Sequence, residues 1–311
     1  MTASMDPQLV ALLQGAPDYP GARAIPIDHL RAFIRQTAEA TPTYPADLAE
    51  VRDFAIPGGA GQDLALRLYR PRGDGPLPLT LFFHGGGFIM GDLDSQDMIA
   101  RALAEAGQTL VLSVDYRLAP EHPYPAAVED AVAALKWAHA HAAEIGADPA
   151  RMATAGDSAG GVLAAVVAVV ARDEKIDLRA QLHFYGSGGY PFDHLPSREE
   201  FKDGALLNVD DIDYFWELYL GDLQAKGREP MASPRFAVLE GVAPTYVLSA
   251  EMDPTRDDAE DLGRRLEAAG VPVVIDRAPG MVHGFLSFLG AVDEAGRGIE
   301  RASAWLRQRW I

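Results

Sequence analysis

The sequence of 311 residues contains no cysteine. This absence excludes disulfide bonds, thiolate-ligated zinc sites and a cysteine nucleophile in one step. A metal site built from histidines is not favoured either, because His139 and His141 lie two apart on a predicted helix and face different ways. We therefore expect no metal and no cofactor.

Positive charge is also scarce. The chain has 27 lysines and arginines against 45 aspartates and glutamates, which gives a net charge of −18. Nucleic acids and anionic membranes are bound through basic surfaces. We therefore expect no nucleic acid and no membrane as partner, and a neutral small molecule fits better as the substrate.

Long hydrophobic runs are missing as well. The longest apolar stretch, residues 162–171, has about half the length that a membrane span needs. Residues 1–20 carry no early basic cluster and only a short apolar run, so we expect no signal peptide. The lack of cysteine is compatible with a reducing compartment, and we expect a soluble cytoplasmic protein.

Short and almost uninterrupted apolar runs alternate with helical stretches along most of the chain. The runs lie at residues 79–83, 109–114, 152–155, 180–185, 245–249 and 271–275. Strands that are covered on both faces have such runs, and alternation with helices is typical of a mostly parallel sheet. Residues 64–68 instead alternate apolar and polar side chains, which predicts a half-buried antiparallel strand. The predicted fold class is α/β, with a mostly parallel central sheet flanked by helices.

Two segments depart from this rhythm. Residues 1–50 are typical of two amphipathic helices, and residues 191–232 contain a turn-rich stretch followed by a helix with a broad apolar face. Such segments can lie over the ends of the strands, so we expect them to form a helical cap. Residues 51–190 and 233–311 then supply the two parts of the α/β core.

The strongest local pattern is Gly-Asp-Ser-Ala-Gly at residues 156–160, between a strand-like run and an apolar helix. A serine on a tight strand-to-helix turn is held with its hydroxyl exposed, and its flanking positions must be small. The helix N-terminus adds positive potential for a developing oxyanion. An incidental serine in a glycine-rich turn is the alternative. We predict that Ser158 is a nucleophile.

A second pattern, His-Gly-Gly-Gly at residues 84–87, directly follows a predicted strand. Successive glycines leave backbone N–H groups that can converge on the anion of a tetrahedral intermediate. A phosphate cradle is a weaker interpretation, because neither the Lys-Ser/Thr of a P-loop nor the glycine spacing of a dinucleotide site is present. A flexible turn stays open as the alternative.

Between these two motifs the chain contains Asp-Tyr-Arg-Leu-Ala-Pro-Glu at residues 115–121 and Pro-Ala-Ala at residues 125–127. From about residue 50 to its C-terminus the chain resembles the hormone-sensitive-lipase family of α/β-hydrolases. The resemblance implies an esterase whose oxyanion hole uses the N–H groups of Gly86, Gly87 and Ala159. Members of this family often form dimers, so a homodimer is one expectation, although the sequence shows no decisive interface.

A serine hydroxyl needs a base to remove its proton and an acid to orient that base. In this fold the acid and then the histidine follow the serine along the chain. His283 lies in a loop after the last predicted strand, whereas His194 falls in the cap segment and is interpreted as a surface residue. Asp253 follows a predicted strand at the carboxyl end of the sheet. The predicted catalytic triad is Ser158, Asp253 and His283.

The surroundings of Asp253 depart slightly from the family. Asp257 and Asp258 would lie a turn into the next helix, where carboxylates more often serve as helix charges. The family's Asp-Pro-Leu-Arg-Asp pattern is matched except that Thr255 stands where leucine is usual. This departure leaves the triad intact and is expected to affect local packing only.

The predicted function is that of a serine carboxylesterase, which hydrolyses small, neutral, short-acyl esters through an acyl-enzyme on Ser158. A lactonase, amidase or deacylase would use the same triad. A non-catalytic small-molecule receptor on this scaffold would be expected to have lost a triad member, most tellingly the histidine. Phe88, Phe215 and Phe285 are candidate substrate contacts from position alone, with core packing as the alternative for each.

Overall fold

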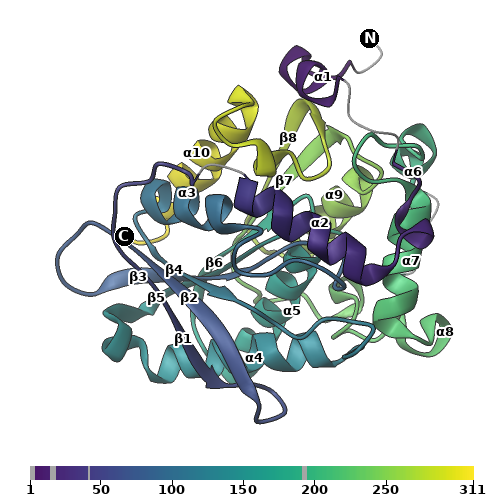
Figure 1. Ribbon diagram of the computed structural model, residues 1–311. Coiled ribbons are helices and arrows are strands. Elements are labelled where there is room, and N and C mark those ends of the chain that lie inside the picture. The colour runs from purple at the N-terminus through teal and green to yellow at the C-terminus, as the bar shows by residue number, and fades with distance from the viewer. Residues whose placement is uncertain (1–3, 15–18, 41–42, 191–194) are drawn as a thin grey trace.

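The computed structural model describes residues 4–14, 19–40, 43–190 and 195–311. Its centre is an eight-stranded sheet in the order β1-β2-β4-β3-β5-β6-β7-β8 (Figure 1). β2 pairs antiparallel with both β1 and β4, and all other neighbours are parallel. The strands are β1 (Leu48–Pro57), β2 (Asp63–Pro71), β3 (Leu77–Phe83), β4 (Leu110–Val114), β5 (Ala147–Asp157), β6 (Leu178–Phe184), β7 (Thr245–Met252) and β8 (Val273–Val282).

The predicted α/β class with a mostly parallel sheet is confirmed. Each of the six apolar runs overlaps one of the strands β3 to β8, and the alternating run at residues 64–68 lies within the antiparallel strand β2. The predicted runs and the observed strands differ most at β8, which extends well beyond the run at residues 271–275. As an edge strand, β8 has exposed side chains along much of its length, so its sequence is not continuously apolar.

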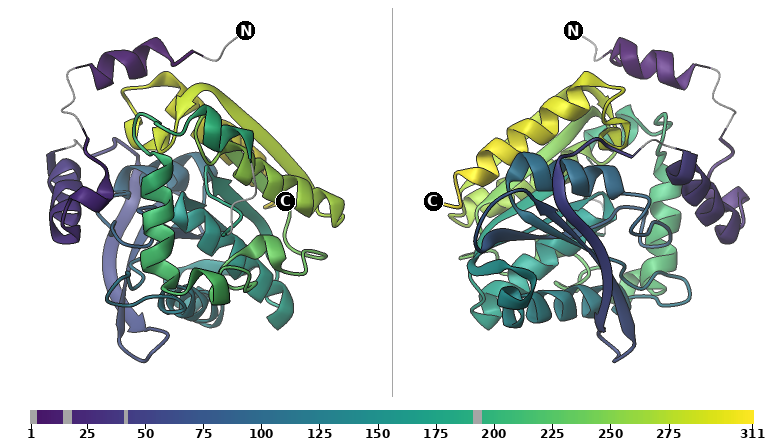
Figure 2. Two further views of the ribbon diagram at one scale, coloured as in Figure 1. Left: turned by 90° about the vertical axis from the view of Figure 1, so that its right-hand side faces the viewer. Right: turned by 60° about the vertical axis from the view of Figure 1, so that its left-hand side comes forward.

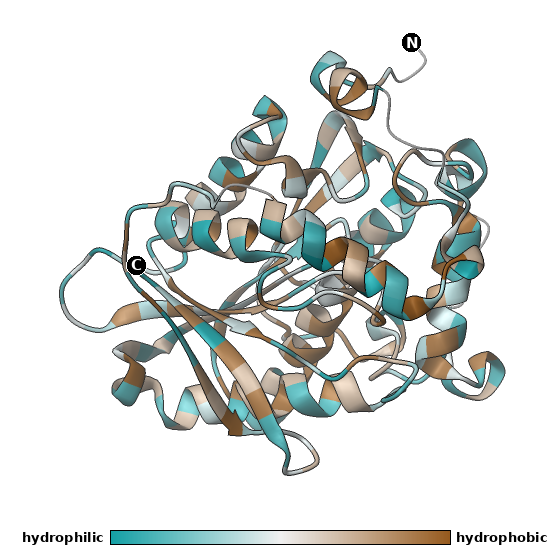
Figure 3. Ribbon diagram, in the orientation of Figure 1, coloured by the Kyte–Doolittle hydropathy of each residue, from teal (hydrophilic) through white to brown (hydrophobic). Residues whose placement is uncertain are grey.

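Helices cover both faces of this sheet. One face carries α4 (Ala126–Ala140), α5 (Ala159–Glu174) and α9 (Arg256–Ala268), and the other carries α3 (Asp97–Gly107) and α10 (Asp293–Arg307) (Figure 1). α3, α4, α9 and α10 bear hydrophobic and hydrophilic residues together, as helices that pack one face on a sheet do (Figure 3). α5 differs, because it is buried from Ala159 to Ala171. Three short turns of 3-10 helix, η2 (Ala142–Ile145), η3 (Pro234–Phe236) and η4 (Phe285–Phe288), connect the larger elements.

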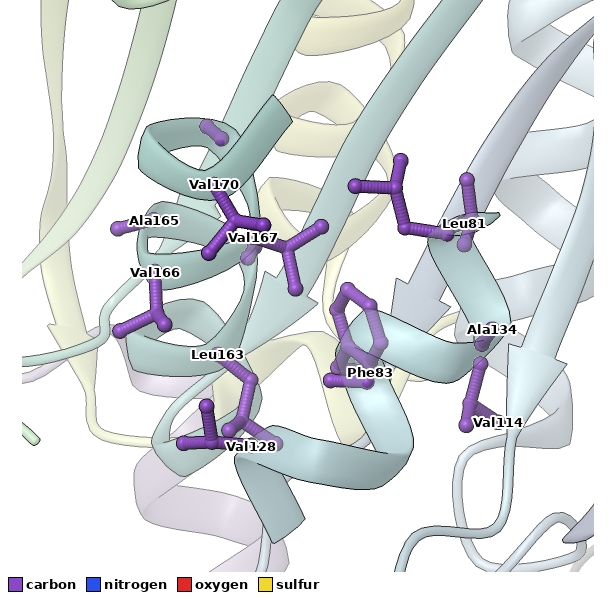
Figure 4. Packing of buried hydrophobic residues seen from close by; sticks show 14 of the residues in the cluster. Leu81, Phe83, Val114, Val128, Ala134, Leu163, Ala165, Val166, Val167 and Val170 are labelled. Carbon is purple, nitrogen blue, oxygen red and sulfur yellow. The ribbon is translucent and has the colours of Figure 1, made fainter. Parts of the chain in front are cut away.

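Successive side chains of the inner strands enter opposite cores. On β3, Phe83 belongs to the cluster under α4 and α5, whereas Phe82 belongs to the cluster under α3 and α10. Figure 4 shows Leu163 of α5 and Val128 of α4 on the side of the sheet to which Phe83 points. Because both faces are buried, the ends of these strands have fixed positions on which a site can be built.

The remaining helices come from the two segments that were predicted to form a cap. Residues 1–50 contribute α1 (Pro7–Leu13), η1 (Ala22–Ala24) and α2 (Ile27–Ala40), and residues 191–232 contribute α6 (Pro196–Glu200), α7 (Val209–Leu220) and α8 (Leu223–Lys226). α2 lies beside α7 in both views of Figure 2. The Ala22 N–H donates a hydrogen bond of 2.6 Å to the Asp211 carboxylate. The two segments therefore contact each other, while residues 191–194 and their His194 lie outside the described residues.

Candidate active site

Ser158 is the single residue between β5, which ends at Asp157, and α5, which begins at Ala159. Its backbone φ of 52° lies in the left-handed region that L residues rarely adopt. The Ser158 N–H donates to the Phe184 carbonyl oxygen on β6 at 2.9 Å, which helps to hold this conformation. The turn places the Ser158 side chain against a cavity at the N-terminus of α5.

His283 lies next to this serine. Its Nε2 atom is 2.8 Å from Ser158 Oγ, and its Nδ1 atom is 2.8 Å from Asp253 Oδ2. A carboxylate only accepts hydrogen bonds, so Nδ1 carries the imidazole proton and Nε2 is left to accept from the Ser158 hydroxyl. The structure thus brings the three residues of the predicted triad into one chain of hydrogen bonds.

The strands explain why residues so far apart in the sequence meet here. Asp253 directly follows β7 and His283 directly follows β8, two neighbouring parallel strands. Carboxyl ends of parallel strands lie at the same edge of a sheet, where loops build the sites of open α/β folds. Ser158 follows β5 at that same edge.

The His-Gly-Gly-Gly segment follows β3, which pairs with β5. Hydrogen bonds hold this segment in place. The Gly85 N–H donates to the Asp157 carboxylate at 2.8 Å, and the Tyr116 hydroxyl donates to the His84 carbonyl oxygen at 2.7 Å. Gly86 has a φ of 114°, and a Cβ there would lie 2.1 Å from the Met90 carbonyl oxygen. These contacts count against the flexible turn that the sequence left open.

Asp157 is a buried carboxyl group directly before Ser158. Burial raises its pKa from an ordinary value of 3.8 to about 7, although the Gly85 N–H favours the charged form. Between about pH 4 and pH 7 the folded chain therefore binds a proton that the unfolded chain has lost, and folding stability falls as the pH rises through this range.

Asparagine in place of Asp157 removes this titration and keeps an oxygen that can accept from the Gly85 N–H. We expect the melting temperature of Asp157→Asn, relative to the unsubstituted protein, to increase between about pH 5 and pH 8. The stability difference should change by at most about 1.4 kcal/mol per pH unit. Differential scanning calorimetry across this pH range measures it.

Asp74 is a matched control, because it is exposed in the connection between β2 and β3. Asp74→Asn should follow the unsubstituted protein at every pH. A constant offset between Asp157→Asn and the unsubstituted protein at all pH values would show that Asp157 does not titrate in this range.

The cavity beside Ser158 is small and mostly apolar. The enclosed space has a volume of about 50 Å³. Its wall consists of Gly87, Phe88, Ser158, Ala159, Val162, Tyr185, Ser187, Leu207, Ile212, Phe215, Trp216, Thr255 and His283. Four of the predicted site residues besides the triad, Gly87, Phe88, Ala159 and Phe215, therefore line the same space as Ser158.

Phe285 is placed elsewhere. Its side chain is fully buried in the core beneath α10, and its ring lies 5.6 Å from the ring of Tyr185. Phe285 begins η4, and this turn directs it away from the cavity wall. The structure does not bring Phe285 to the substrate side, so the core-packing alternative holds for this residue.

Thr255 is a residue whose contacts the sequence did not suggest. Its backbone N–H and its hydroxyl both lie within hydrogen-bonding distance of Asp253 Oδ1, at 2.7 and 2.8 Å. Asp253 itself has no exposed surface. The two-residue spacing between Asp253 and Thr255 was the only signal, since a carboxylate often accepts from the N–H two residues on.

No group of three or more metal-ligating side chains occurs among the described residues. None of the helices in that part of the chain is long and apolar enough to cross a membrane.

Comparison with known proteins adds to this geometry. Residues 80–287 match the sequence model of a family with the alpha/beta hydrolase fold. The esterase LipI of Mycobacterium tuberculosis is 40% identical, over 98% of this chain and 95% of its own length. The carboxylesterase NlhH of the same organism is 39% identical, over 98% of this chain and 96% of its own.

A solved structure gives the same result for the fold. The hyperthermophilic esterase of the archaeon Pyrobaculum calidifontis superposes with a TM-score of 0.92 at 34% identity, and the match covers 98% of each chain. Family match, relatives and structural neighbour agree with the resemblance drawn from the motifs. The chain therefore belongs to the hormone-sensitive-lipase family of the α/β-hydrolase fold, and it is a carboxylesterase.

Proposed function

We propose that this carboxylesterase hydrolyses small, neutral, short-acyl esters with Ser158 as nucleophile, His283 as general base and acid, and Asp253 as the residue that orients His283. One observation carries the proposal. Ser158, His283 and Asp253 are joined by two hydrogen bonds of 2.8 Å each, and Ser158 lines the cavity. A base within this distance of a hydroxyl is in place to take its proton.

In the first half-reaction, Ser158 Oγ forms a bond to the ester carbonyl carbon while its proton passes to His283 Nε2. The tetrahedral intermediate then collapses, the bond to the alcohol oxygen breaks, and that oxygen takes the proton from Nε2. In the second half-reaction a water molecule gives a proton to Nε2 as its oxygen attacks the acyl carbon. Collapse releases the carboxylic acid and returns the proton to Ser158.

The N–H groups of Gly86, Gly87 and Ala159 are the proposed oxyanion hole. Gly87 and Ala159 line the cavity with Ser158, and the bond from Gly85 to Asp157 ties the glycine segment to the serine turn. Donors that are fixed before the reaction stabilise the oxyanion without reorganisation in the transition state.

Residues 1–50 and 191–232 are the proposed cap. Arg23 donates two hydrogen bonds of 2.7 Å to Glu217 of α7, which joins the two segments on their exposed side. On the inner side, Leu30 of α2 and Phe215 of α7 share one apolar cluster. Phe215 also lines the cavity, so this cap limits the space in front of Ser158.

The size of the cavity predicts the acyl preference. Across p-nitrophenyl acetate, butyrate, octanoate and dodecanoate, we expect kcat/KM to be highest for acetate or butyrate and at least about tenfold lower for dodecanoate. Steady-state kinetics with solubilised esters measures this series. A kcat/KM that rises steadily with chain length would contradict the proposed short-acyl preference.

Trp216 of α7 gives the matched variant, because it forms part of the cavity wall and packs against Phe88 with ring centroids 5.4 Å apart. Trp216→Leu keeps an apolar side chain and enlarges the cavity. The preference should then move toward octanoate. An unchanged preference in a folded Trp216→Leu would show that another part of the wall sets the limit.

A further inference from the structure

Thr255 lies two residues after Asp253, at the start of α9, and its side chain is almost completely buried. Three polar atoms surround its hydroxyl. Asp253 Oδ1 lies at 2.8 Å, the Tyr185 carbonyl oxygen at 3.3 Å and His283 Nδ1 at 3.4 Å. This single hydroxyl therefore touches both residues that are proposed to activate Ser158.

The hydroxyl has one proton to donate, so the three contacts are not equivalent. The Asp253 carboxylate is the nearest acceptor and the charged one, and hydrogen bonds to charged groups are the stronger ones. The proton on His283 Nδ1 is already donated to the other carboxylate oxygen, Oδ2. We therefore assign the Thr255 proton to Asp253 Oδ1.

The Asp253 carboxylate is stabilised by the groups that donate hydrogen bonds to it. It is fully buried, and among the described residues only His283, which is neutral in this arrangement, lies within salt-bridge distance of it. Oδ1 receives the backbone N–H and the hydroxyl of Thr255, while Oδ2 receives Nδ1 of His283. A buried carboxylate without enough donors is costly, and each donor also lowers its affinity for a proton. An aliphatic side chain at position 255 would leave only the backbone N–H on Oδ1.

We propose that Thr255 is a positioning residue for ester hydrolysis, whose hydroxyl fixes the Asp253 carboxylate and tempers its basicity toward His283. The inference rests on the proposed roles of Ser158, His283 and Asp253. Thr255 has two effects through Asp253. It keeps Oδ2 aimed at Nδ1, and it limits how strongly the carboxylate stabilises a protonated imidazole, which cannot accept the proton of Ser158.

The test compares Thr255→Val, which has nearly the same shape and no hydroxyl, with Thr255→Ser, which keeps the hydroxyl. The measurement is kcat and KM for p-nitrophenyl butyrate as a function of pH. We expect Thr255→Val to lower kcat about tenfold with little change in KM, and to move the acid limb of the profile to higher pH. Thr255→Ser should restore the position of the acid limb and kcat to within about twofold.

Other outcomes overturn the proposal. Equal losses in both variants with an unchanged acid limb would mean that Thr255 only fills space. A higher KM at constant kcat would mean that it contacts the substrate from the cavity wall. Circular dichroism and melting temperature check the fold, and Thr255→Ala serves as a second hydroxyl-free variant if Thr255→Val is unfolded.

A different result would contradict the proposed function. A fluorophosphonate probe should label Ser158 in the unsubstituted protein, as mass spectrometry of the peptide would show. Absence of that label removes the proposed nucleophile whatever the Thr255 variants do. Labelling of Ser158 together with an unchanged profile in Thr255→Val rejects the role of Thr255 alone.

Discussion

Replacing Ser158 with alanine is expected to lower kcat for p-nitrophenyl acetate by at least about 10⁴-fold while the fold stays intact. The alanine has no oxygen to attack the carbonyl carbon, so no acyl-enzyme forms. His283 and the proposed oxyanion donors remain and should support only a weak attack by water. Steady-state kinetics, with circular dichroism for the fold, measures the effect.

Ser287 is the matched control, since it is an exposed serine close to His283 in the sequence and does not line the cavity. Ser287→Ala should keep kcat within about twofold, because surface substitutions away from structural features usually change little. If Ser158→Ala retains a substantial part of the activity in a preparation free of unsubstituted protein, then Ser158 is not the nucleophile.

The second large effect is expected at Gly160, in the first turn of α5. A Cβ at this position would lie 1.9 Å from the Phe83 carbonyl oxygen and 2.6 Å from that of His84. Both obstacles are backbone atoms of β3 and of the glycine segment that follows it, so no side-chain rotation relieves the clash. We expect Gly160→Ala to lose about 3 kcal/mol or more of the free energy of unfolding, a large share of a domain's usual stability.

Any Gly160→Ala protein that folds should also hydrolyse esters poorly, because relief of the clash moves the glycine segment away from Ser158. Urea unfolding followed by circular dichroism, with kcat on the folded fraction, separates the two effects. Gly296→Ala is the control: a Cβ added to this glycine of α10 would meet no atom within 4 Å, and alanine there should stabilise the helix by roughly 0.5–1 kcal/mol. Equal stability of both variants would contradict the proposed packing at Gly160.

The strands inside the sheet could be predicted from the sequence because both of their faces are buried. β3 and β4 are nearly continuous apolar runs for this reason. β8 was predicted too short, because Asp276 and Arg277 follow the apolar run and still belong to the strand. At the edge of the sheet these side chains form ion pairs with Arg301 and Glu260 instead of entering the core.

The meeting of Ser158, Asp253 and His283 could be predicted because each of them directly follows a strand, so that chain order and strand order suffice to bring them together. Thr255 could not be recognised in this way. Its proposed role depends on which of three polar atoms its hydroxyl is bonded to, and this is decided by side-chain geometry around Asp253. The position of Phe285 could not be predicted for a related reason, since the turn after His283 decides whether its ring faces the cavity or the core.

The separation of the site residues along the chain has a consequence for folding. Ser158 and His283 are 125 residues apart, and their meeting requires β6, β7 and β8 all to be part of the sheet. Contacts of such long range are slow to form, because the entropy of closing a long loop is lost before the contacts are gained. A chain that has formed its helices and inner strands but not added β8 lacks His283, the proposed base, beside Ser158. Ester hydrolysis therefore requires the complete sheet. During refolding, the appearance of hydrolysis product would indicate that β8, the last strand in the sequence, has joined the sheet.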